Sequence, residues 1–169
     1  MGFRELKSEL QKLDKADLIK HISELYKKFK PVKEYFDFYL SPDELEILNR
    51  YKERVQEGFY PKRGDQLKLS ISRKAINDFK KLGTSVDALA DLMLFYVECG
   101  VEFTNDFGDI NESFYISIET TYAKTLELIS KENLLSKFEE RAGKIVEESS
   151  EIGWGFADYI AEVYFTYYD

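Results

Sequence analysis

Cysteine and histidine are almost absent from this chain, which contains one of each among its 169 residues. A single cysteine, Cys99, excludes an intramolecular disulfide framework and is typical of a protein from a reducing compartment. A single histidine, His21, excludes zinc sites built from several histidines and the paired Glu-x-x-His motifs of di-iron bundles. We therefore expect a cytoplasmic protein without internal disulfide bonds.

Proline, glycine and long apolar runs are also scarce. Three prolines and nine glycines leave little room for long irregular segments. No apolar run reaches the roughly 18 residues of a membrane-spanning helix, and no signal peptide opens the chain, so we expect no membrane association. The hydrophobic share of 44% and the charged share of 33% are typical of a globular protein. The length suits one domain of ordinary size, and we predict a single domain over residues 1–169.

Basic residues are missing from the middle of the chain, where none occurs between Lys81 and Lys124. Residues 1–84 carry 19 Lys and Arg against 14 Asp and Glu, whereas residues 85–169 carry 5 against 18. The net charge of −8 is therefore divided into a basic half and an acidic half. This asymmetry predicts either that the halves pack together and partly neutralise each other, or that opposite charges meet a partner or a second copy.

Apolar residues recur at helical spacing along the whole chain. Two stripes open it: Phe3, Leu6, Leu10 and Leu13, then Leu18, Ile22, Leu25 and Phe29. The short link between them, with Asp14 as N-cap, predicts a helical hairpin of nearly antiparallel neighbours. The pattern Ser41-Pro42-Asp43-Glu44 predicts that a capped helix begins with Pro42, and an irregular connection follows over Phe59–Asp65. About nine helices without a convincing strand predict an all-α protein with no sheet, either an irregular multi-helix bundle or stacked helical hairpins.

The stretch from Thr84 to Glu112 predicts a long helix followed by an acidic loop. The helix is apolar on nearly every side, which is typical of a helix at the centre of a domain. Carboxylates at spacings of four, seven and four residues interrupt it, and they fall within a sector of roughly 60°. This acidic strip consists of Asp87, Asp91, Glu98 and Glu102, and it continues with Asp106 and Asp109 beyond the helix. We expect Asp109 to cap the next helix.

Two interpretations of the acidic strip remain open. Like charges four residues apart destabilise a helix by about 0.2–0.5 kcal/mol per pair, so the strip should either face water or pair with cations. The expected cations belong to the most basic window of the chain: Lys62, Arg63, Lys68, Arg73, Lys74, Lys80 and Lys81. The other interpretation is a site for Mg²⁺ or Ca²⁺, since both ions prefer carboxylate oxygens, and such an ion can hold a phosphorylated substrate.

The basic window also has two interpretations, a phosphate or nucleic-acid contact and a solvated or internally paired face. The overall acidity and the lack of a recognisable nucleic-acid module favour the second, so we expect no nucleic-acid partner. The aromatic share of 15% includes two clusters, Tyr35–Tyr39 and Tyr164–Tyr168, that cannot each face one core. At least one cluster should therefore contribute to a contact surface.

Six segments carry a resemblance to a known family: Lys30–Leu40, Tyr60–Gly64, Lys74–Gly83, Ala90–Glu98, Phe103–Glu112 and Ile152–Gly155. Together they resemble an uncharacterised family of small all-helical bacterial proteins, a domain of unknown function. The resemblance covers nearly the whole chain and implies one intact domain. It implies no activity and assigns no catalytic residue.

The lack of a complete catalytic set favours a non-enzymatic function. We predict a helical protein-interaction or scaffold module that binds a protein partner or itself and needs no cofactor. The alternative is a hydrolase that acts on phosphate esters or nucleotides with Mg²⁺ or Ca²⁺, using Asp91, Glu98, Glu102 and Asp106. Glu147–Glu151 matches the Glu-Glu-x-x-Glu half of the motif of all-α nucleotide pyrophosphohydrolases, but the Glu-x-x-Asp half is missing.

Overall fold

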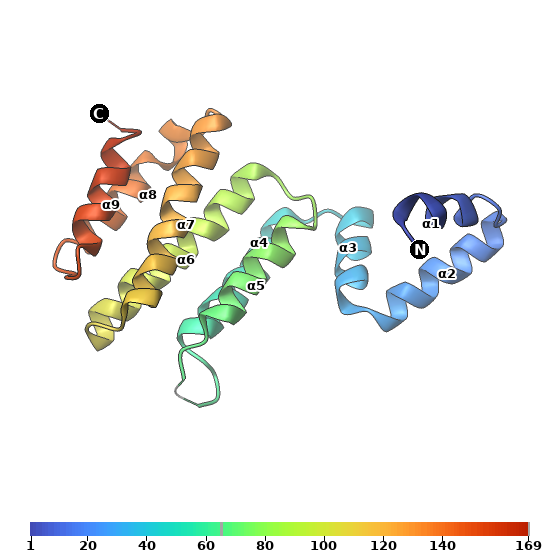
Figure 1. Ribbon diagram of the computed structural model, residues 1–169, viewed down its shortest axis with the longest axis horizontal. Coiled ribbons are helices and arrows are strands. Elements are labelled where there is room, and N and C mark those ends of the chain that lie inside the picture. Colours follow the sequence, from blue (N-terminus) through green and yellow to red (C-terminus); the bar gives the residue numbers. More distant parts are fainter. Residues whose placement is uncertain (65, 169) are drawn as a thin grey trace. The chain divides into compact units, whose positions relative to one another are not determined.

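The computed structural model describes residues 1–64 and 66–168 (Figure 1). Over these residues it contains nine α-helices and no strand, which confirms the predicted fold class. The helices are α1 (Phe3–Leu10), α2 (Lys15–Lys28), α3 (Lys30–Leu40), α4 (Glu44–Phe59), α5 (Leu69–Lys80), α6 (Val86–Phe107), α7 (Glu112–Lys131), α8 (Leu135–Glu148) and α9 (Phe156–Phe165). None of these described helices combines the length and the apolar character needed to cross a membrane.

The chain divides into two compact units, of which the first comprises residues 1–43 and the second begins at Glu44. A domain normally has a hydrophobic core of its own. No side chain of α1, α2 or α3, whose residues are all described, is buried. Compactness alone therefore does not make the first unit a domain, and the single domain over residues 1–169 stays a prediction.

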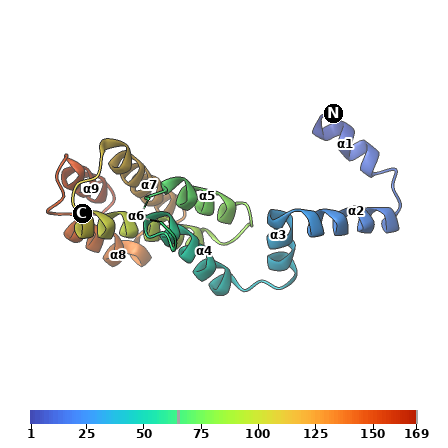
Figure 2. The same ribbon diagram turned by 90° about the horizontal axis from the view of Figure 1, so that it is seen from below.

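The first unit is held together by contacts between α2 and α3. The Asp14 side chain caps α2 by accepting a hydrogen bond from the Asp17 backbone N–H at 2.8 Å, as predicted. α3 packs against α2, and the Tyr26 hydroxyl donates a hydrogen bond to the Asp37 carboxylate at 2.6 Å. α1 diverges from α2, so the predicted hairpin is open (Figure 2).

α6 lies at the centre of the second unit. Figure 2 shows it between α5 and α7 on one side and α4 and α8 on the other, and α9 packs against α7 and α8. Eleven residues of α6 are buried: Ala88, Leu89, Ala90, Leu92, Leu94, Tyr96, Val97, Cys99, Gly100, Val101 and Thr104. The Ser85 hydroxyl caps the helix by accepting a hydrogen bond from the Ala88 N–H at 3.1 Å. The predicted central helix is therefore present, begins two residues after Thr84 and is buried on most sides.

The start of α4 differs from the prediction. The helix begins at Glu44, two residues later than the Ser-Pro-Asp-Glu pattern predicts. The Glu44 carboxylate accepts hydrogen bonds from the Ser85 backbone N–H at 2.6 Å and from the Ser85 hydroxyl at 2.8 Å. It therefore joins the start of α4 to the start of α6. α4 continues to Phe59, where an irregular connection was expected to begin, and Asp65 of that connection lies outside the described residues.

The boundary between α6 and α7 also differs from the prediction. α6 continues to Phe107, which places Asp106 inside the helix and not beyond it. The cap of α7 is Asn111, whose side chain accepts a hydrogen bond from the Phe114 N–H at 3.0 Å. Asp109 does not cap this helix, because its carboxylate accepts a hydrogen bond from the Tyr115 hydroxyl at 3.0 Å.

Two glycines allow neighbouring helices to approach closely. A Cβ atom at Gly58 of α4 would collide with the Ser72 hydroxyl and would lie 3.0 Å from the Lys68 carbonyl oxygen. Ser72 fills this space and donates a hydrogen bond to the Val55 carbonyl at 2.7 Å. A Cβ atom at Gly100 of α6 would lie 2.6 Å from an Ile118 methyl group of α7. The contacts of α4 with α5 and of α6 with α7 therefore depend on the absence of a side chain.

Candidate functional site

Asp87 and Asp91, the first two residues of the acidic strip, form ion pairs with other helices. Asp87 pairs with Lys137 of α8, whose Nζ lies 2.6 Å from the Oδ1 atom. Asp91 pairs with Lys52 of α4, and the ammonium group of Lys52 also lies 5.5 Å from the centroid of the Phe95 ring. The N-terminal part of the strip therefore faces cations, not open water.

Arg141 of α8 joins the second and third acids of the strip, Asp91 and Glu98. Its Nε and Nη2 atoms donate hydrogen bonds to the two carboxylate oxygens of Glu98, at 2.5 Å and 2.8 Å. Its Nη1 atom lies 3.1 Å from Asp91 Oδ2, and its Nη2 atom also reaches the Asp91 carbonyl oxygen at 3.3 Å. Burial alone would lower the pKa of the Arg141 guanidinium, but the hydrogen bonds and charges of Glu98 and Asp91 outweigh burial and raise it. Arg141 is therefore held as a cation between two carboxylates.

The cations that pair with the strip differ from the expected ones. Lys52, Lys137 and Arg141 all lie outside the basic window of residues 62–81. Lys137 and Arg141 are four residues apart on α8, as Asp87 and Asp91 are on α6. The equal spacing can be seen in the sequence, in the half that has five basic residues. It indicates ion pairing only once α8 is known to pack against α6.

The remaining residues of the strip are exposed. Asp106 accepts a hydrogen bond from the Tyr60 hydroxyl at 2.9 Å, and burial together with this bond raises the pKa of Tyr60. Glu102 and Asp106 line a cavity of about 470 Å³ together with Glu98 and Glu148. Glu98 is paired with Arg141, and Glu148 lies 3.3 Å from Lys144 Nζ, so two of these four carboxylates already have cations.

The described residues contain no group of three or more His, Cys, Asp and Glu side chains placed to hold a metal ion. Cys99 is 2% exposed, and burial, with smaller contributions from Glu102 and Glu98, raises the pKa of its thiol to about 12. A thiol of this kind is protonated at neutral pH and is a poor nucleophile. The metal-dependent hydrolase therefore stays a prediction, and no group of metal-binding side chains among the described residues supports it.

The residues of the basic window do not share one face. Lys62 and Arg63 are exposed in the connection between α4 and α5, and Lys68 and Lys81 lie at the two ends of α5. Lys74 forms an ion pair with Asp78 at 2.6 Å. Only Arg73 and Lys80, which are two helical turns apart on α5, line the same surface feature.

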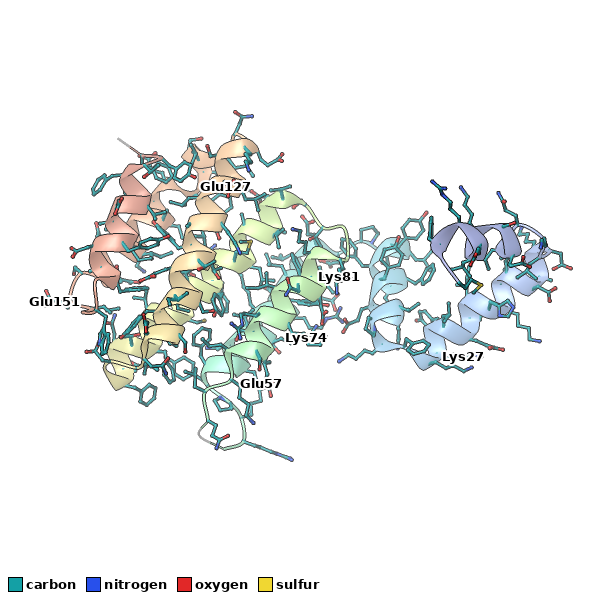
Figure 3. The ribbon with its side chains drawn as sticks, viewed as in Figure 1. Lys27, Glu57, Lys74, Lys81, Glu127 and Glu151 are labelled. Atoms are coloured by element: carbon teal, nitrogen blue, oxygen red, sulfur yellow. The ribbon has the colours of Figure 1, made fainter. Side chains whose placement is uncertain are left out.

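This feature is a groove of about 780 Å³ in which α6 forms the floor and α5 and α7 form the walls. Each helix contributes one face. The lining residues are Arg73, Ile76, Asn77 and Lys80 of α5, Val86, Leu89 and Met93 of α6, and Ser113, Ile116, Ser117, Thr120, Thr121, Lys124, Glu127, Leu128 and Lys131 of α7. In Figure 3, Glu127 is labelled on α7, and the label of Lys74 identifies α5. At about 100° per residue, the groove residues of α6 lie opposite the acidic strip.

The groove combines an apolar floor with cationic walls. Its four cations, Arg73 and Lys80 on one wall and Lys124 and Lys131 on the other, face a single carboxylate, so the lining has an excess of three positive charges. That carboxylate, Glu127, is already paired with Lys131 at 2.5 Å. Among the described residues, Arg73, Lys80 and Lys124 form no ion pair. Neither the apolar floor nor the accumulation of free cations was predicted from the sequence.

The fold and these surfaces define a small all-helical protein whose central helix is fixed by ion pairs on one side and lines an apolar, cationic groove on the other. The chain belongs to a family of unknown function, DUF6155, whose model matches residues 1–167. The resemblance to an uncharacterised helical family is thereby confirmed. No curated protein and no solved structure matches the chain.

Proposed function

We propose that this protein is a non-enzymatic helical interaction module and that the groove between α5, α6 and α7 binds an acidic amphipathic helix of a protein partner. The groove's apolar floor between cationic walls is the observation that carries this proposal. Recognition of an amphipathic helix in an apolar groove is a recurring mode of peptide binding. A cytoplasmic location, supported by the single buried Cys99, and a bacterial source belong to the same proposal.

The dimensions of the groove suit a helix. Its α7 wall runs from Ser113 to Lys131, which at 1.5 Å per residue is about 27 Å. A helix of roughly 18 residues has the same length and presents a continuous apolar stripe. Met93 at the floor is a flexible side chain that adapts to different apolar partners.

The charge of the groove selects an acidic ligand. The chain as a whole carries −8, yet the lining carries three more cations than carboxylates. Acidic side chains along the edges of a bound helix would pair with Arg73 and Lys80 on one side and Lys124 on the other. Such rim charges mainly increase specificity and the rate of association, while the apolar floor provides most of the affinity.

A direct test uses a fluorescein-labelled 18-residue helical peptide with a leucine stripe and glutamates on its remaining face. We expect binding at micromolar concentrations, and no binding of the counterpart peptide in which every glutamate is lysine. Reversing a charge on either wall, as in Arg73→Glu or Lys124→Glu, should weaken binding by roughly tenfold or more. Lys62→Glu makes the same charge change outside the groove and should leave affinity within about twofold. Equal binding of both peptides, or equal loss in the Lys62 control, would refute the proposal.

A further inference from the structure

The first two helices carry an apolar stripe that their own unit covers only in part. Phe3 is 80% exposed, Ile22 is 44% exposed and Phe29 is 51% exposed. The stripe also includes Leu6, Leu10 and Leu25, which are all exposed. Scattered apolar residues are ordinary on a protein surface, but a continuous stripe along two successive helices is not.

These helices need a covering surface to be stable. α1 has 8 residues and α2 has 14, whereas isolated helices shorter than about 12–15 residues are marginal in water. Most helical stability in proteins comes from packing of an amphipathic face, and residues 1–43 bury no side chain among themselves. The open hairpin therefore has the amphipathic sequence of helices that pack against another surface, although none of its side chains is buried.

The spacing of the stripe shows which kind of surface would cover it. On α1 it follows steps of three and four residues from Phe3 to Leu10, and on α2 it follows steps of four and three from Leu18 to Leu25; Leu13 and Phe29 continue the spacing just beyond the two helices. This alternation is the heptad spacing with which one helix packs into another, knobs into holes. A second pair of helices with the same spacing would fit this stripe.

We propose that residues 3–29 are a self-association element, in which the open α1–α2 hairpins of two copies of this chain join their stripes into an intermolecular four-helix bundle. The charge of the unit permits a second copy as the occupant. Residues 1–43 carry nine Lys and Arg and eight Asp and Glu, a net charge of +1, so two identical units meet with little net repulsion. The eight carboxylates make the same stripe a poor match for an anionic membrane surface, which attracts strongly basic faces.

The size of the stripe also agrees with this occupant. At roughly 150–250 Å² for a large, fully exposed side chain, the exposed apolar residues of α1 and α2 present on the order of 600 Å² per copy. A stable interface of standard size takes roughly 600–1,000 Å² from each partner, so the stripe reaches the lower end of this range. The methylene groups of the flanking lysines contribute further apolar area. The groove lies in the other unit, so its ligand and this self-association are separate properties.

The test is the mass of the full chain in solution, measured by sedimentation equilibrium from about 1 to 100 µM. We expect a species of twice 19.9 kDa for the natural sequence. Ile22→Glu places a carboxylate in the stripe and should raise the dimer dissociation constant at least roughly a hundredfold, giving a monomer. Ser23→Glu adds the same charge one residue away, outside the stripe, and should stay dimeric.

Far-UV circular dichroism of both variants shows whether the chain keeps its helix content and remains folded. A natural chain that is monomeric at 100 µM would overturn the proposal, as would an Ile22→Glu variant that is folded and still dimeric. A monomeric natural chain that floats with vesicles of anionic phospholipid, in a manner abolished by Ile22→Glu, would assign the stripe to a membrane surface and would equally overturn it. The acidic peptide assay reports on the groove in each case, so either proposal can fail without the other.

Discussion

Substitution of Arg141 by methionine tests whether the acidic strip is a structural feature. Methionine keeps the length and much of the apolar stem of arginine but removes the cation between Asp91 and Glu98. Removing one partner of a buried ion pair destabilises a protein by about 3–5 kcal/mol, because the remaining charge is left without compensation. Arg141 is 26% exposed and Asp91 and Glu98 are each 29% exposed, so water compensates in part. We therefore expect a loss of about 2–3 kcal/mol in the free energy of unfolding.

The loss can be measured by urea unfolding and by calorimetry. For a chain of this length, a change of 1 kcal/mol lowers Tm by roughly 3–4 °C, so the expected fall is about 6–12 °C. Lys144→Met is the matched control, since it also replaces a cation by methionine on the same helix, at a lysine that is 68% exposed and pairs with Glu148. This control should change the free energy of unfolding by less than about 0.5 kcal/mol.

A double-mutant cycle with Glu98→Gln separates the ion pair from other effects. Because Arg141 donates two hydrogen bonds to Glu98, we expect a coupling energy of about 1–2 kcal/mol. A coupling energy near zero, or equal destabilisation by the Lys144 control, would refute the assignment of the strip as a structural network. In that event, the metal-site interpretation of the strip should be tested by calorimetry with Mg²⁺ and Ca²⁺.

Two further predictions concern tight packing and the buried thiol. Gly58→Ala should destabilise the protein by about 1–3 kcal/mol in urea unfolding, because the new methyl group would collide with Ser72; Gly64→Ala, at an open position with positive φ, serves as a comparison for backbone strain alone. Cys99 should react with a neutral-pH disulfide reagent at least roughly a thousandfold more slowly in the folded chain than in urea, since its pKa is raised from 9.0 to about 12 and the thiolate fraction falls in proportion. Rapid stoichiometric labelling of the folded chain would contradict the burial of this residue.

The parts of the fold that depend on local pattern could be predicted from the sequence. The buried stripe of α7, from Tyr115 to Ile129, and the caps at Asp14 and Ser85 follow from helical periodicity and capping preferences within a few residues. The start of α4 could not be predicted in this way, because Glu44 bonds to a residue 41 positions away. Local rules are reliable only where the interactions are local.

In the candidate site, too, the features that depend on local spacing could be predicted, and those that depend on helix packing could not. The alignment of Asp87, Asp91 and Glu98 on one face follows from spacing, but their partners depend on how α6 crosses α4 and α8. The groove was missed because its α7 wall has just two large apolar residues, Ile116 and Leu128, which are twelve residues apart and form no apolar stripe. The two aromatic clusters differ in exposure. Tyr35 and Tyr39 of the first cluster are exposed, whereas Tyr168 of the second is buried and donates a hydrogen bond to the Leu135 carbonyl at 3.0 Å.

The distribution of ion pairs supports the proposal that the groove binds a ligand. The acidic half of the chain has five basic residues, and four of them are paired within it: Lys131, Lys137, Arg141 and Lys144. The fifth is Lys124, which lines the groove. On the opposite wall, Arg73 and Lys80 also form no ion pair among the described residues. The chain therefore compensates cations where α6 packs against α8 and leaves cations uncompensated where α6 forms the floor of an open groove. Cations beside a half-buried apolar surface would gain ion-pair partners when a complementary ligand binds, and this supports the proposed function of the groove on the side of α6 opposite the acidic strip.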